Sequence, residues 1–204
     1  RRCVVMGGRA VEERASGDVI AEMQRERAAG MAAGAMGFTT SRTLNDQTSD
    51  DRPVASRLAA WGEVQALVGV AGRAGGIFEI TNEDAAVENP DAQPEYFGRL
   101  TDLARESGAT IVFGVGSSRH APESWKPWMG LVDSVSDAGG RMFAQVHSRQ
   151  FNVILNFEGQ LPFDGLPEWK ALRARSREDQ IRGLRDPDLR AKLIHEAHHG
   201  EYGN

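Results

Sequence analysis

The sequence predicts an α/β protein built on a parallel β-sheet. Three observations support this fold class: helix-like segments alternate with short apolar runs, glycines separate each helix from the run that follows, and four such units come in succession. Parallel strands need a crossover of this kind. A doubly wound sheet and a (β/α)₈ barrel both fit the pattern. A full barrel takes eight units in about 250 residues, so this chain of 204 residues would hold about half of one.

The first unit leads from a helix over 18–33 into a strand over 35–40. Ser16 or Asp18 can cap the helix, because both side chains accept a hydrogen bond from the first turn. Gly34 follows the helix and suits its C-terminal exit. The strand then ends in polar residues, as strands do where α/β proteins place their chemistry.

The other three units repeat the same order. Helices are expected over 59–73, 94–107 and 123–138, and the strands that follow them over 77–81, 110–116 and 141–147. The apolar residues of each helix recur at helical spacing, which indicates one buried face. Since the strands are apolar nearly throughout, we expect both faces of the sheet to be buried.

The pattern changes after residue 150. Residues 157–163 are irregular, and helices are expected around 168–175, 178–184 and 188–197, the last beginning at a proline. We therefore divide the chain into residues 1–150, the βα units of the sheet or half-barrel, and 151–204, an irregular segment plus helices of the same domain.

Composition excludes several classes of partner. There are 24 Lys and Arg against 29 Asp and Glu, a net charge of −5, which argues against nucleic acid because phosphate binding needs a basic surface. No apolar run is long enough for a membrane helix. The single cysteine, Cys3, excludes a disulfide framework and fits a reducing, cytoplasmic location. The chain does not begin with methionine, so we expect a piece of a longer protein. Oligomeric state is not predicted.

Several segments, taken in order, resemble one known family. They are Val5–Gly7, Ala33–Thr43, Ala74–Glu79, Gly139–Gly140 with Ala144–Val146, Leu161–Phe163 and Leu184–Arg190. Together they are similar to the D-aminoacylase branch of the amidohydrolase superfamily, the N-acyl-D-amino-acid deacylase-like proteins. The resemblance implies a metal-bearing TIM barrel that hydrolyses the amide bond of a small molecule. It implies zinc or another divalent metal, with most ligands outside this chain, so the fragment alone is expected to be inactive.

The chain departs from the family at two metal-ligand positions. Zinc-bearing members carry a histidine at the end of each of two successive strands, where this sequence has Thr81 and Val115. A threonine hydroxyl is a poor zinc ligand and valine is none. The metal ligands in this chain are therefore unknown, and a non-catalytic or metal-free homologue of the same barrel is the alternative.

Glu79 and His147 are the candidate catalytic residues. Strand alternation places Glu79 on one face of its strand with Ile77 and Thr81, and Phe143, Gln145 and His147 on the equivalent face of another. A carboxylate in an apolar strand could serve as a general base or a substituted ligand, or form a structural ion pair. His147, at the end of its strand, could move protons or bind metal, or simply be a hydrogen-bonded histidine.

Ser41, Arg42 and Arg149 are the candidate substrate-binding residues. Each follows the end of a strand, and the planar guanidinium of arginine can hold a substrate carboxylate through two hydrogen bonds. Ser41 and Arg42 could instead stiffen the corner between strand and loop, and Arg149 could be an ordinary surface residue. The segment Asn82–Asp84 could offer a metal carboxylate or cap a turn.

His195-Glu196-Ala197-His198-His199 matches the H-E-x-x-H pattern of zinc peptidases. In that pattern two histidines one helical turn apart bind zinc and the glutamate activates water. No third ligand follows in this sequence, and the barrel architecture differs from that of such peptidases. A zincin-like peptidase is therefore the less favoured hypothesis.

Overall fold

The computed structural model describes residues 2–43, 46–48, 52–83, 86, 89–117, 121–149, 154–159 and 161–200. The chain forms two compact units, Arg1–Arg149 and Gln150–Asn204, and each is described by itself. The division lies within one residue of the boundary drawn from the sequence. That both units belong to one catalytic domain stays a prediction.

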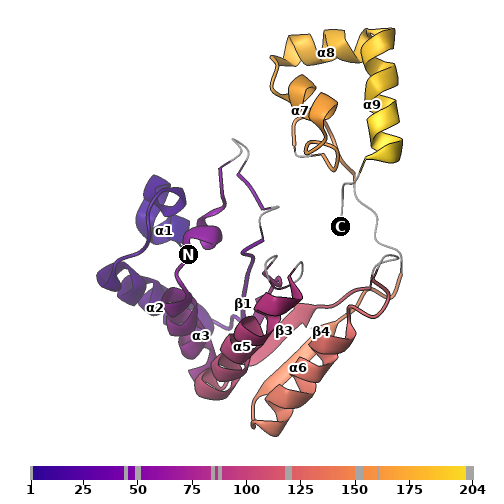
Figure 1. Cartoon of the computed structure of the whole chain (residues 1–204). Helices are drawn as coiled ribbons and strands as arrows, with labels where there is room; N and C mark the ends of the chain where they lie inside the picture. The colour runs from indigo at the N-terminus through magenta and orange to yellow at the C-terminus, as the bar shows by residue number, and fades with distance from the viewer. Residues whose placement is uncertain are drawn as a thin grey trace. The chain divides into compact units, whose positions relative to one another are not determined.

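The first unit is built on a four-stranded parallel sheet, as predicted (Figure 1). Its strands are β1 (Gly37–Thr40), β2 (Ile77–Ile80), β3 (Thr110–Gly114) and β4 (Arg141–Gln145), in that order across the sheet. They are joined by α3 (Trp61–Arg73), α5 (Gln93–Ser107) and α6 (Lys126–Asp137). The register aligns Gly37 with Ile77, Ile77 with Thr110, and Thr110 with Arg141. The first residues of neighbouring strands are therefore paired with one another, and the carboxyl ends of all four strands lie at the same end of the sheet.

The helix before β1 follows its sequence signals closely. It is α2 (Gly17–Ala32), and the Ser16 hydroxyl oxygen accepts a hydrogen bond from the Val19 amide at 3.4 Å. Gly34 has a φ of 98°, which only glycine adopts readily. The preceding elements, α1 (Arg2–Met6) and the 3₁₀ helix η1 (Gly7–Val11), were not predicted. Each is five residues long, too short for periodicity to indicate a helix.

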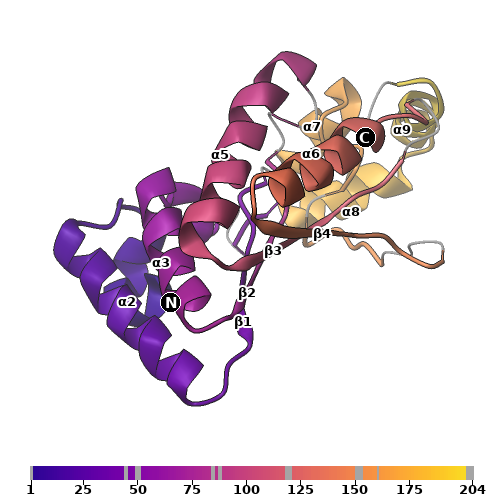
Figure 2. The ribbon, with the colours of Figure 1, turned by 90° about the horizontal axis from the view of Figure 1, so that it is seen from below.

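The main core lies between one face of the sheet and helices α3, α5 and α6 (Figure 2). The sheet contributes Phe78, Ile80, Ile111, Phe113 and Met142, and the helices contribute Val64, Val68, Leu100, Leu103, Trp128, Leu131 and Val135. Trp128 and Phe97 meet edge to face, with ring centroids 4.9 Å apart. Trp128 is thus a core residue of α6, whereas Trp125 is 39% exposed.

The opposite face of the sheet carries Thr39, Glu79, Val112 and Phe143 in register. Thr39 is exposed and Phe143 is 60% exposed. Val112, between them, is only 9% exposed, so in the first unit taken by itself this face is partly buried, and the expectation that both faces are buried is met fully on one face only. An apolar strand sequence tells what a strand can bury, but it does not tell whether the same chain supplies the layer that covers it.

Gly72 lets α3 approach the backbone at the end of α5. A Cβ at Gly72 would lie 1.9 Å from the carbonyl oxygen of Ser107. Gly72→Ala is expected to lower the free energy of unfolding by at least about 1–3 kcal/mol, since backbone must move. Gly69 lies on the same helix, and its Cβ would meet only the end of the Arg73 side chain, at 3.5 Å. Gly69→Ala should be neutral or stabilising by up to about 1 kcal/mol. Denaturant unfolding of both variants measures this, and equal effects would contradict the packing argument.

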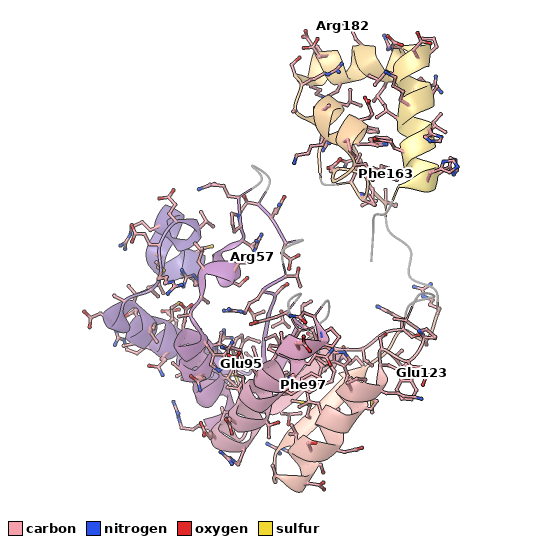
Figure 3. All side chains as sticks on the ribbon, viewed as in Figure 1. Arg57, Glu95, Phe97, Glu123, Phe163 and Arg182 are labelled. Carbon is pink, nitrogen blue, oxygen red and sulfur yellow. The ribbon has the colours of Figure 1, made fainter. Side chains whose placement is uncertain are left out.

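The second unit is a small helical cluster of α7 (Pro167–Arg173), α8 (Arg177–Arg185) and α9 (Pro187–His199). Its core gathers around Trp169, whose indole Nε1 donates to the carbonyl oxygen of Leu193 at 3.0 Å. Phe163, labelled in Figure 3, packs against Trp169 with ring centroids 4.6 Å apart. The three predicted helices are confirmed. None of the helices described in either unit has the length and apolar character needed to cross a membrane.

Candidate active site

A hollow of about 620 Å³ lies where the strands of the sheet end. Because parallel strands point the same way, their carboxyl ends bring side chains from separate parts of the sequence to one edge. β2 and the residues after it contribute Glu79, Ile80, Thr81 and Asn82, the end of β3 contributes Val115, and β4 and its extension contribute Gln145 and His147. This is the edge at which parallel α/β proteins bind ligands.

Glu79 lies on the open face of the sheet, between Thr39 of β1 and Val112 of β3. The predicted alternation is confirmed, since the neighbours Phe78 and Ile80 point into the helix-covered core. Glu79 is partly exposed on the face opposite the helix-covered core. The carboxylate is therefore available to a ligand in the hollow without first breaking a buried ion pair.

His147 follows β4 by two residues and is exposed. Its side chain lines the same hollow as Glu79. The structure thus brings the two candidate catalytic residues, which are 68 positions apart in the sequence, to one edge of the sheet. An imidazole and a carboxylate beside one cavity can exchange protons with a bound molecule.

Arg42 binds neighbouring protein groups. Its Nε lies 2.7 Å from Glu83 Oε1, both side chains are mostly buried, and its guanidinium also donates to the carbonyl oxygen of Ala59. Ser41 accepts a hydrogen bond from the Thr43 amide at 3.5 Å. These contacts match the alternative interpretation of a stiffened corner, and substrate binding by Ser41 and Arg42 stays a prediction. Ser41 lines a second hollow, of about 400 Å³, beside α1 and α3.

The Arg42–Glu83 pair lies over a buried tyrosine. Burial raises the pKa of Tyr96, and the nearby Glu83 carboxylate raises this pKa further. The phenol therefore stays neutral at physiological pH. Arg42 thus has a clear structural role, because its positive charge compensates the negative charge of the Glu83 carboxylate next to the core residue Tyr96.

Of the remaining candidate residues, Asn82 lines the hollow and Arg149 does not. The Asn82 amide donates to the carbonyl oxygen of Gly114 at 3.0 Å and so ties the end of β2 to the end of β3. Asn82 also lines the hollow, a role that its position directly after a strand could have indicated. Arg149 is exposed at the end of the first unit and is not part of the hollow's lining. Asp84 lies outside the described residues.

Metal donors are sparse in the described part of the chain. No three histidine, cysteine, aspartate or glutamate side chains gather there closely enough to hold an ion. Thr81 and Val115 directly follow β2 and β3 and both line the hollow. These are the positions at which the resemblance inferred from the sequence expects histidines, and that correspondence stays a prediction. The hollow offers Glu79 and His147 as donors, and they do not make a complete zinc ligand set.

The H-E-x-x-H segment lies on α9 in the second unit, and His195 and His199 are exposed there. Glu196 Oε2 accepts a hydrogen bond from the Glu168 amide, at 3.0 Å, at the start of α7. The glutamate that would activate water in a peptidase is therefore engaged in capping a helix. This geometry does not favour the zincin-like peptidase.

The fold resembles parts of several solved amidohydrolases. An N-acyl-D-glutamate deacylase from Bordetella bronchiseptica, complexed with zinc and a phosphonate mimic of the tetrahedral intermediate, matches with a TM-score of 0.53 and 15% identity. A D-aminoacylase matches with a TM-score of 0.51 and 17% identity. A D-aminoacylase mutant in complex with CuCl₂ matches with a TM-score of 0.52 and 15% identity. Each match covers 72% of this chain and 28% of the solved chain.

The resemblance to D-aminoacylases inferred from the sequence is therefore confirmed at the level of fold. No family model and no curated protein sequence matches this chain. The chain spans little more than a quarter of the length of the solved structures it resembles.

Proposed function

We propose that this chain, with its fold of part of a D-aminoacylase, belongs to a hydrolase that cleaves the C–N amide bond of N-acyl-D-amino acids. The observation that carries the proposal is the hollow at the carboxyl ends of four parallel strands, lined by both Glu79 and His147. In this proposal the sheet is about half of a (β/α)₈ barrel, and its open face is the barrel interior.

Hydrolysis of an amide requires a proton to leave the attacking water and another to reach the departing amine. We assign the first transfer to the Glu79 carboxylate, which lines the hollow and is partly exposed. His147 is positioned to donate to the amine or to the carbonyl oxygen. Arg149, Ser41 and Arg42 are the proposed partners of the substrate carboxylate, although Arg42 would first have to leave Glu83.

A divalent metal, zinc or another ion, is part of the proposal because the structural neighbours include zinc and copper complexes. When bound, such an ion lowers the pKa of a water molecule and polarises the carbonyl. The described residues do not by themselves fit this ion. We therefore propose that its ligands lie outside this chain and confine the roles above to the side chains of this chain.

The second candidate is a homologue of the barrel that binds no metal and has no hydrolase activity. Thr81 and Val115 favour it, since both stand in the hollow where a histidine would have to be to hold zinc.

Hydrolysis assays separate the two candidates. The protein at its natural length should release free amino acid from N-acetyl-D-glutamate or a related N-acyl-D-amino acid in preference to the L-enantiomer. Chelation should remove this activity, and added Zn²⁺ should restore it. Absence of hydrolysis with all N-acyl-D-amino acids, with or without added metal, would reject the first candidate.

A further inference from the structure

The second unit carries a histidine pair that the proposed function does not use. His195 and His199 are four residues apart on α9, so they lie on the same face of the helix. Their rings lie close, with centroids 4.3 Å apart and planes inclined by 23°, and rotation of the exposed His195 side chain would let both rings direct a nitrogen lone pair toward one ion. Both are exposed, so an ion from solution can reach them.

The hydrogen bonding of His199 leaves its outer nitrogen ready to bind a metal. Its Nδ1 lies 2.8 Å from the carbonyl oxygen of His195. A carbonyl oxygen can only accept, so Nδ1 carries the donated proton, and in the neutral imidazole the lone pair is then on Nε2. Histidines that bind metals are usually held in this way, with the second nitrogen donating to a carbonyl or carboxylate.

We propose that His195 and His199 form a two-imidazole surface site for a late divalent transition metal such as Ni²⁺ or Cu²⁺. Imidazole nitrogen suits these ions, with Cu²⁺ binding most tightly, whereas Mg²⁺ and Ca²⁺ prefer oxygen ligands. Water would fill the other coordination positions. Because Glu196 caps α7, the site binds metal without the general base of a peptidase.

Calorimetric titration of the chain with NiCl₂ tests the proposal. His195→Ala and His199→Ala should each weaken Ni²⁺ binding by more than about tenfold, since loss of even an outer partner of a metal ligand costs about 10–100-fold. His198→Ala is the matched control. His198 is exposed on the same helix, and its ring meets that of His199 only edge-on, with centroids 6.5 Å apart. It should bind Ni²⁺ like the unchanged chain, and MgCl₂ should produce no binding heat.

Far-UV circular dichroism should be unchanged in all three variants, because the substituted side chains are exposed. His147→Ala separates this site from the hollow of the first unit and should leave the affinity for Ni²⁺ unchanged. The proposal is overturned if Ni²⁺ binding survives both His195→Ala and His199→Ala, or if His198→Ala or His147→Ala weakens it as much.

Discussion

Replacing Glu79 by glutamine is expected to lower the rate of N-acyl-D-amino-acid hydrolysis by about 10²–10⁴-fold, the usual contribution of a general acid–base group. Glutamine has nearly the same shape and can still form hydrogen bonds, but it cannot take a proton from water. Because Glu79 is partly exposed and lines the hollow, the substitution should leave the fold intact. The loss should appear mainly in kcat, with a small change in KM.

Glu106→Gln is the matched control for this prediction. Glu106 lies near the end of α5 and is exposed, with its Oε1 3.4 Å from Nη2 of Arg105. It does not line the hollow. Its variant should keep full activity. If Glu79→Gln is as active as Glu106→Gln, the Glu79 carboxylate has no part in proton transfer and the assignment is wrong.

Replacing Arg2 by methionine is expected to lower the free energy of unfolding of the first unit by about 3–5 kcal/mol. Arg2 in α1 and Glu63 in α3 form an ion pair, with only 6% and 3% of these side chains exposed. The Arg2 guanidinium also donates to the carbonyl oxygen of Glu13 at 2.5 Å. Its removal leaves a buried carboxylate without its partner, which is the costly part of breaking such a pair.

The penalty for Arg2→Met should depend on pH. Burial already raises the pKa of Glu63 above 4.5, and Arg2 opposes this effect, so the pKa rises further when Arg2 is lost. A carboxyl whose pKa is raised by folding stabilises the folded state while it is protonated, and this stability is lost as the pH rises through the raised pKa. The difference between variant and unchanged chain should therefore grow as the pH increases above about 4.5.

The double variant Arg2→Met, Glu63→Leu removes both charges and should regain most of the lost stability, because apolar residues can replace a buried ion pair at little cost. Denaturant unfolding at several pH values measures all three proteins. A double variant as unstable as the single one would show that the loss comes from packing and not from the unpaired carboxylate.

The sequence predicted the sheet and its helices well because their signals are local. Ser16 caps α2, and Gly34 adopts the positive φ that ends it, as expected. The period-two alternation around Glu79 predicted its face correctly. Glu79 and His147, which the sequence placed on equivalent faces of two strands, line one hollow, although β2 and β4 are not neighbours in the sheet.

What the sequence could not predict depends on contacts between distant residues. The Arg42–Glu83 pair joins positions 41 apart, and the Arg2–Glu63 pair joins positions 61 apart. Neither pairing leaves a local pattern, so the sequence left open whether Arg42 stiffens the corner or binds substrate. The partial exposure of one sheet face has the same origin, since no strand sequence records which layer packs against it.

Metal analysis of the protein at its natural length tests the central claim, that this fold serves a metal-dependent amide hydrolase. The measurement is best made on the His195→Ala, His199→Ala double variant, so that the proposed surface site does not contribute. The account predicts that this variant retains stoichiometric zinc or another divalent metal, together with N-acyl-D-amino-acid hydrolysis that is lost on chelation. A variant that holds no metal and hydrolyses no amide would contradict it and identify the metal-free homologue.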